Sequence, residues 1–151
     1  ESAQLLSTAH RVIDGELYVG LTAMGRRVKR WQLPDFRDDV LYQATHVNHP
    51  SAVWCRESRD NYFWLFRHFS GLLTEYTHRY GKHHKCEQLL AEHLMQAPAG
   101  IPRVGPTKMP SAMADEYKVG DDPLTNYRNY YKIGKSKMHK WTKRQAPEWI
   151  A

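Results

Sequence analysis

The 151-residue sequence has only two cysteines, Cys55 and Cys86, so we expect no disulfide framework. His78, His83 and His84 lie near Cys86, but their spacing matches no established metal site. No apolar run approaches the roughly 18 residues of a membrane span. No P-loop, glycine-rich nucleotide motif or Ser-His-Asp order is present. We therefore expect no metal, no cofactor and no membrane partner, and two thiols favour a reducing cytoplasm.

Acidic residues are outnumbered, and the formal net charge of +6 gives a pI of about 9.4. A surface of this charge attracts polyanions. One basic cluster, Arg26, Arg27, Lys29 and Arg30 in the stretch GRRVKRW, contains no acid. We interpret these four residues as candidate contacts to DNA phosphates.

Apolar residues recur every three or four positions over residues 58–80, which predicts one long helix that ends at Gly81. Shorter helices are predicted over 1–13, over about 85–96 and after Asp122, a good N-cap followed by Pro123. The Pro- and Gly-containing stretch 96–110 is predicted to be a loop rather than a domain boundary, because little chain follows it. The fold class predicted is mainly α, one compact domain over residues 1–151 with three to four helices and long loops.

The stretch 127–144 contains seven cations and no acid, with aromatic rings between them. The cations are candidates for phosphate contact, and the rings can stack on unpaired bases. Alternatively, the rings are core anchors and the lysines are simply solvated. The candidate DNA-binding residues chosen here are Arg128, Tyr131, Lys132, Lys135, Lys137, Lys140 and Trp141. The tail APEWIA is expected to dock through Trp149 and Ile150.

His49 is a further candidate, since it precedes Pro50 in the polar stretch 45–58, predicted to be a turn that leads into the long helix. The residue before a proline is held in an extended conformation. Such a turn can present His49 to a ligand, or it can be purely structural.

Three segments of the chain, Asn48–Ser58, Glu75–His84 and Tyr127–Trp149, resemble motifs of a set of phage-encoded proteins. Three stretches, residues 62–81, 109–121 and 130–135, are similar to parts of the pyrimidine-dimer DNA glycosylase family, also called phage endonuclease V. That family consists of small, basic, mainly helical DNA-repair enzymes.

The resemblance implies a mechanism in which an N-terminal α-amine attacks the sugar C1′ and forms a Schiff base. A glutamate seven positions after a histidine assists, by stabilising the cationic transition state and moving protons. Glu1 matches this glutamate, so we expect a segment that bears the histidine and the nucleophile to precede Glu1. The substrate base must be extruded from the duplex, and the basic stretches 26–30 and 128–144 would hold the phosphates.

The function expected is therefore a glycosylase with AP-lyase activity on pyrimidine dimers, acting as a monomer on damaged double-stranded DNA in the host cytoplasm. Gln4, one helical turn after Glu1, replaces the basic residue that the glycosylases tend to have. One alternative is a non-catalytic DNA-binding module on the same scaffold. Another is a phage structural or host-interaction protein.

Overall fold

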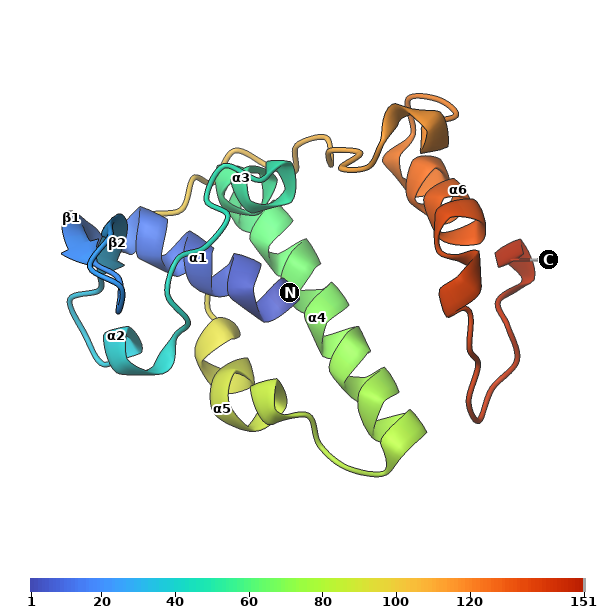
Figure 1. Ribbon diagram of the computed structural model, residues 1–151, viewed down its shortest axis with the longest axis horizontal. Coiled ribbons are helices and arrows are strands. Elements are labelled where there is room, and N and C mark those ends of the chain that lie inside the picture. Colours follow the sequence, from blue (N-terminus) through green and yellow to red (C-terminus); the bar gives the residue numbers. More distant parts are fainter. Residues whose placement is uncertain (151) are drawn as a thin grey trace. The chain divides into compact units, whose positions relative to one another are not determined.

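The computed structural model describes residues 1–150, and the chain divides into two compact units, Glu1–Lys108 and Met109 onward. The first unit contains five helices and a two-stranded antiparallel sheet, and the second contains one α-helix with three 3₁₀ helices, labelled η (Figure 1). The elements are α1 (Ser2–Asp14), β1 (Glu16–Leu21), β2 (Arg27–Gln32), α2 (Arg37–Val40), α3 (Pro50–Glu57), α4 (Arg59–Tyr80), α5 (Lys85–Leu94), η1 (Asp115–Tyr117), α6 (Pro123–Gly134), η2 (Ser136–Met138) and η3 (Glu148–Ile150).

The prediction of a mainly α fold is confirmed, but six α-helices are described rather than three or four. The long helix predicted over 58–80 is α4, whose first amides are capped by Ser58 and whose end adopts the left-handed conformation at Gly81 (φ 66°). Asp122 caps α6 as predicted, by accepting from the backbone N–H groups of Leu124 and Thr125.

Two parts of the first unit differ from the prediction. The stretch 45–58 is not only a turn, since α3 begins at Pro50, whose fixed φ suits the first helical position. The hairpin β1–β2 was not predicted, because its turn lacks an Asn-Gly pair and depends instead on Gly25 (φ 74°). Residues 96–110 contain no helix or strand, as predicted, and the division between the units falls near their end. That residues 1–151 act as one domain stays a prediction.

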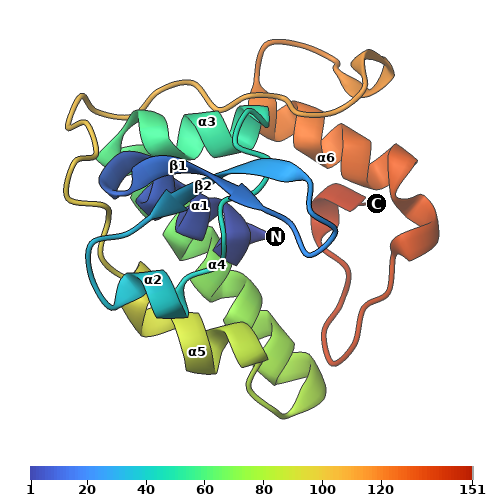
Figure 2. The ribbon, with the colours of Figure 1, turned by 60° about the vertical axis from the view of Figure 1, so that its left-hand side comes forward.

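Helix α1 is the central element of the first unit, where it packs against α3, α4 and α5 (Figures 1 and 2). Leu6 and Ala9 on α1 are completely buried, together with Tyr62 of α4 and Leu94 of α5. The apolar face of this helix therefore lies in the core. Polar residues of this helix are buried as well, including His10 and Arg11.

The Arg11 guanidinium is 1% exposed, and each of its five N–H groups has an acceptor. Nε donates to the carbonyl of Tyr42 (2.7 Å), and Nη1 donates to the carbonyl of Trp31 (2.8 Å) and to Asp38 Oδ1 (2.6 Å). Nη2 donates to the carbonyls of Asp38 (2.7 Å) and Leu41 (2.8 Å). One side chain of α1 thus binds the end of β2, Asp38 of α2 and the two residues that follow α2.

The second unit is organised by α6 and its buried residue Asn126. The Asn126 side chain donates to Ser111 Oγ (2.9 Å) and to the Gly120 carbonyl (2.8 Å), and it accepts from the Val119 N–H (2.8 Å). The Tyr127 hydroxyl donates to the Pro110 carbonyl (3.0 Å). These bonds fasten the irregular segment 110–120 onto α6.

We expect Arg11→Met to lower the free energy of unfolding by about 3–5 kcal/mol, because it leaves four carbonyls and a carboxylate without their donor. Urea denaturation followed by circular dichroism measures the change. Arg26→Met, at an exposed position in the hairpin turn, is the control and should change stability by less than about 0.5 kcal/mol. Equal stability of the two variants would contradict the central role of Arg11.

Candidate nucleic-acid interface

The hairpin β1–β2 presents a face with both cations and apolar side chains. Its register pairs Leu17 with Trp31, Val19 with Lys29 and Leu21 with Arg27, so these six residues share one face. Leu17, Val19 and Leu21 are 52%, 55% and 67% exposed, which is unusual for three apolar residues on one strand. These six residues define the face hereafter called the ribbon face, on which the apolar side chains of β1 are more than half exposed.

Four predicted DNA-binding cations lie on this hairpin. Arg27 and Lys29 are exposed on the ribbon face, Arg26 is exposed in the turn, and Arg30 lies on the opposite face, opposite Tyr18. Among residues 1–150, none of the four forms a salt bridge. The structure thus brings them together on one two-stranded element, with their charge available to a ligand.

The predicted cations of the second unit follow α6 and the segment after it. The Arg128 guanidinium lies 5.6 Å from the centre of the Trp149 ring, and Lys135 Nζ lies 5.3 Å from the centre of the Tyr130 ring. Lys132, Lys137 and Lys140 are exposed. Arg128 and Lys135 are therefore engaged with aromatic rings of their own unit.

Tyr131 and Trp141 lie in an aromatic cluster with His139 and Trp149. The Tyr131 ring stacks on the His139 ring (centroids 4.9 Å apart) and meets the Trp149 ring edge-on (5.8 Å). The ring centres of Tyr131 and Trp141 are 6.4 Å apart. The expected docking of the tail through Trp149 is confirmed, and both Tyr131 and Trp141 are half-buried. Base stacking by either ring stays a prediction.

Glu1 precedes the first turn of α1, and its carbonyl accepts from the N–H groups of Gln4 (2.9 Å) and Leu5 (3.1 Å). Its side chain is exposed and makes no capping hydrogen bond to that turn. The Glu1 carboxylate thus does not stabilise the start of its own helix. It lies at the N-terminal end of α1, the most deeply buried helix of the unit.

His49 has a structural role that the sequence left open. Its Nδ1 accepts from the Ser51 N–H (3.2 Å), which makes His49 the N-cap of α3. His84 similarly caps α5 by accepting from the Cys86 N–H (3.0 Å), and His83 Nδ1 lies 3.1 Å from a Glu87 oxygen. Among residues 1–150, no three His, Cys, Asp or Glu side chains are placed to hold a metal ion, and no helix has the length and apolar character to cross a bilayer.

A network of ionisable groups connects α1 with α2, α4 and the loop after α5. Arg37 Nη1 donates to His10 Nδ1 (2.9 Å), so the His10 proton is on Nε2, which donates to the Tyr62 hydroxyl (2.8 Å). Tyr62 in turn donates to the Leu94 carbonyl (2.8 Å). Arg37 also pairs with Asp14 and Asp35, both at 2.8 Å.

These contacts shift the pKa values of the network. Burial, followed by the nearby positive charge of Arg37, lowers the pKa of His10 to about 4. Hydrogen bonds from Arg37 lower the pKa of Asp35 to about 2. Burial of Asp14 opposes ionisation, but hydrogen bonds from Gly100, Arg37 and Ala99 outweigh it and lower the pKa of that carboxyl. The His10 imidazole is therefore neutral and the two carboxylates are charged at neutral pH.

Sequence reasoning missed the ribbon face and this network. The apolar residues of β1 alternate with others, which is a signal for a strand, but exposure of their side chains has no sequence signal. For the network, the sequence shows only that Arg37 lies among acids in the stretch LPDFRDD. Comparisons of the chain with protein-family models, with curated proteins and with solved structures found no match.

We expect the stability of the fold to fall as the pH drops from about 6.5 to about 4. The folded pKa of His10 lies below its unfolded value, so the unfolded chain binds the extra proton in this window. The loss approaches about 3 kcal/mol at the acid end, since each pKa unit corresponds to about 1.4 kcal/mol. Urea midpoints measured across this range should decline for the native chain.

The variant His10→Gln does not titrate, and its stability should be flatter over the same pH range. His83→Gln, at an exposed histidine, is the matched control and should behave like the native chain. Parallel pH curves for the native chain and His10→Gln would contradict this assignment.

Proposed function

We propose that this protein binds duplex DNA, with the hairpin β1–β2 as the element that enters the major groove. The observation that carries the proposal is the ribbon face, where Arg27 and Lys29 stand beside three exposed apolar side chains. A two-stranded ribbon fits the major groove. Cations there neutralise phosphates or pair with guanine, and apolar groups contact the thymine methyl group.

The cations of α6 and the following segment support the same function. Lys132, Lys137 and Lys140 are exposed and would add phosphate contacts that are independent of base sequence. Binding through many cations predicts a strong dependence on salt concentration. A phage structural or host-interaction role predicts no such dependence.

As a second candidate, we propose that the protein acts on the bound duplex as a pyrimidine-dimer glycosylase with AP-lyase activity. The observation in its favour is Glu1, an exposed carboxylate that makes no cap to α1 and stands on a rigid, buried helix. In this proposal the carboxylate stabilises the cationic sugar after the base departs and moves a proton in the elimination step. The attacking amine would belong to the segment that the resemblance places before Glu1.

We expect the double variant Arg27→Gln/Lys29→Gln to bind duplex DNA more weakly and with less salt dependence. The slope of log K against log salt should fall in magnitude by about 2, since each phosphate contact contributes about 0.9. Fluorescence anisotropy of a labelled duplex between about 50 and 200 mM salt measures both quantities.

Lys82→Gln/Lys85→Gln removes the same charge from exposed positions of the first unit outside the hairpin, and it is the matched control. A separate variant, Lys132→Gln/Lys135→Gln, tests the second unit. If the control weakens binding as much as the hairpin variant, net charge rather than the ribbon face drives binding. If the native chain does not bind DNA near 100 mM salt, the DNA-binding proposal fails.

For the enzyme proposal, we expect Glu1→Gln to reduce strand cleavage of ultraviolet-irradiated plasmid by about 10²-fold or more while DNA affinity is retained. The assay uses the chain together with the segment that the resemblance places before Glu1. Borohydride trapping of the covalent Schiff base provides a second readout.

Glu16→Gln changes another exposed carboxylate of the same unit and should leave cleavage unaffected. If the native protein binds DNA but gives neither cleavage nor a trapped complex, the non-catalytic module is the correct alternative.

A further inference from the structure

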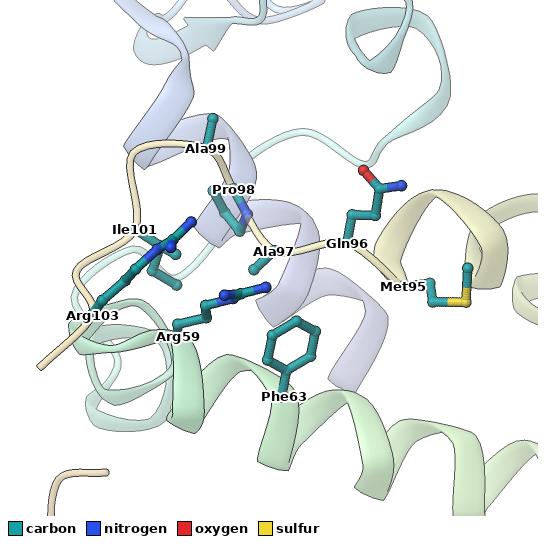
Figure 3. Close-up of a pocket in the computed structure, with 9 residues that line it drawn as sticks. All are labelled: Arg59, Phe63, Met95, Gln96, Ala97, Pro98, Ala99, Ile101 and Arg103. Carbon is teal, nitrogen blue, oxygen red and sulfur yellow. The ribbon is translucent and has the colours of Figure 1, made fainter. Parts of the chain in front are cut away.

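A pocket of about 310 Å³ lies beside the first turns of α4, opposite the loop that follows α5 (Figure 3). Its apolar walls include Phe63, Pro98 and Ile101, and the last two are buried. Two arginines, Arg59 and Arg103, also line it. This volume is at the lower end of small-molecule sites, so the pocket accommodates one ring and one charged group rather than an extended chain.

The two arginines give the pocket its chemistry. In Figure 3 both side chains extend toward the segment that contains Ala97 and Pro98. Among residues 1–150, neither forms a salt bridge. The Arg59 guanidinium carbon lies 5.2 Å from the centre of the Phe63 ring, so this ring borders the charged part of the pocket.

The walls of the pocket are fixed by hydrogen bonds to the core. The Arg59 N–H donates to the Pro102 carbonyl (2.8 Å), which joins the start of α4 to the loop. Asp14 accepts from the N–H groups of Ala99 and Gly100, both at 3.0 Å. A pocket formed in advance loses less free energy to ordering when a ligand binds.

We infer that this pocket binds a phosphate monoester attached to a flat ring, the chemistry of a 5′-nucleoside monophosphate. Two guanidinium groups without carboxylate partners match a phosphate monoester, which carries about −1.5 to −2 charges, better than a singly charged carboxylate. Phe63 and the apolar wall offer a surface for the ring. The ligand is a free mononucleotide or the 5′-phosphorylated end of a strand. The site does not depend on the DNA-binding proposal, since its residues are separate from the ribbon face.

Isothermal titration calorimetry of the chain with thymidine 5′-monophosphate, inorganic phosphate and thymidine tests the inference. The monophosphate should bind with one site per chain, and thymidine should bind at least about tenfold more weakly, because it lacks the charge-assisted hydrogen bonds. Arg59→Gln and Arg103→Gln should each weaken monophosphate binding about tenfold or more. Phe63→Leu should weaken monophosphate binding but leave binding of inorganic phosphate unchanged.

Arg67→Gln, at an exposed position further along α4, is the matched control and should retain full affinity. Circular dichroism of each variant shows whether it is folded. No binding of the monophosphate at millimolar concentration, equal binding of thymidine, or equal affinity of the Arg59 and Arg103 variants and the native chain would each overturn the inference.

A competition experiment then distinguishes the two sources of the ligand. A single-stranded oligonucleotide with a 5′-phosphate that displaces the monophosphate better than its 5′-hydroxyl counterpart supports binding of strand ends. Failure of both oligonucleotides to displace the monophosphate supports the free mononucleotide, whereas equal displacement by both would contradict a site for a phosphate monoester. The hairpin variant Arg27→Gln/Lys29→Gln should bind the monophosphate normally, so a failure of DNA binding and a failure of this site are separable.

Discussion

The buried guanidinium of Arg11 is the interaction on which the first unit depends. A charge with almost no solvent exposure is tolerated only when its hydrogen-bonding groups are satisfied, and here five donors meet five acceptors. Four of those acceptors are backbone carbonyls between residues 31 and 42, a segment whose buried apolar side chains are Leu33 and Leu41. Arg11 therefore supplies specific hydrogen bonds where the hydrophobic effect alone would leave the chain free to move.

The same helix positions both candidate surfaces. The Trp31 carbonyl that Arg11 holds lies in β2, so this bond anchors the hairpin whose ribbon face is exposed. Asp14, one turn further along α1, fixes the loop that forms one wall of the phosphate pocket. A polar side on a core helix is costly unless every group is paired. In this protein the groups paired with Arg11 and Asp14 hold two surface elements in position.

The elements that could be predicted from the sequence are those with strong local signals. Helix α4 has a long apolar stripe and a glycine at its end, and α6 has an Asp-Pro start, so both were located closely. The hairpin, α2 and α3 are short, and residues distant in the sequence stabilise them: α3 packs on α1, and Arg11 of α1 donates to carbonyls of β2 and α2. Local sequence patterns do not reveal such contacts. His49 shows the same limit of sequence-based prediction. A histidine before Pro50 is compatible with a ligand site and with a helix cap, and only the hydrogen bond from the Ser51 N–H in the structure identifies the cap.

The candidate nucleic-acid interface shows a different limit of sequence-based prediction. Net charge does not distinguish cations that stabilise the fold from cations that are exposed to a ligand. Arg37 has Asp35, Asp38 and Asp39 close to it in the sequence. Its guanidinium forms salt bridges with Asp14 and Asp35, so its charge is already neutralised within the protein. The hairpin cations have no acid within the stretch 25–31, and they form no salt bridge in the described chain. For the hairpin cations, the absence of acids nearby in the sequence agrees with the absence of salt bridges among residues 1–150. For Arg11 the nearest acid in the sequence is Asp14, yet its carboxylate partner is Asp38, 27 residues away. The absence of nearby acids is also an incomplete guide for α6, where Arg128 and Lys135 contact aromatic rings instead of acids. A cation can bind a nucleic acid only if it is exposed and is not already bound by a carboxylate, a carbonyl or an aromatic ring. In the first unit, Arg27 and Lys29 meet this condition and lie on the same face of the hairpin.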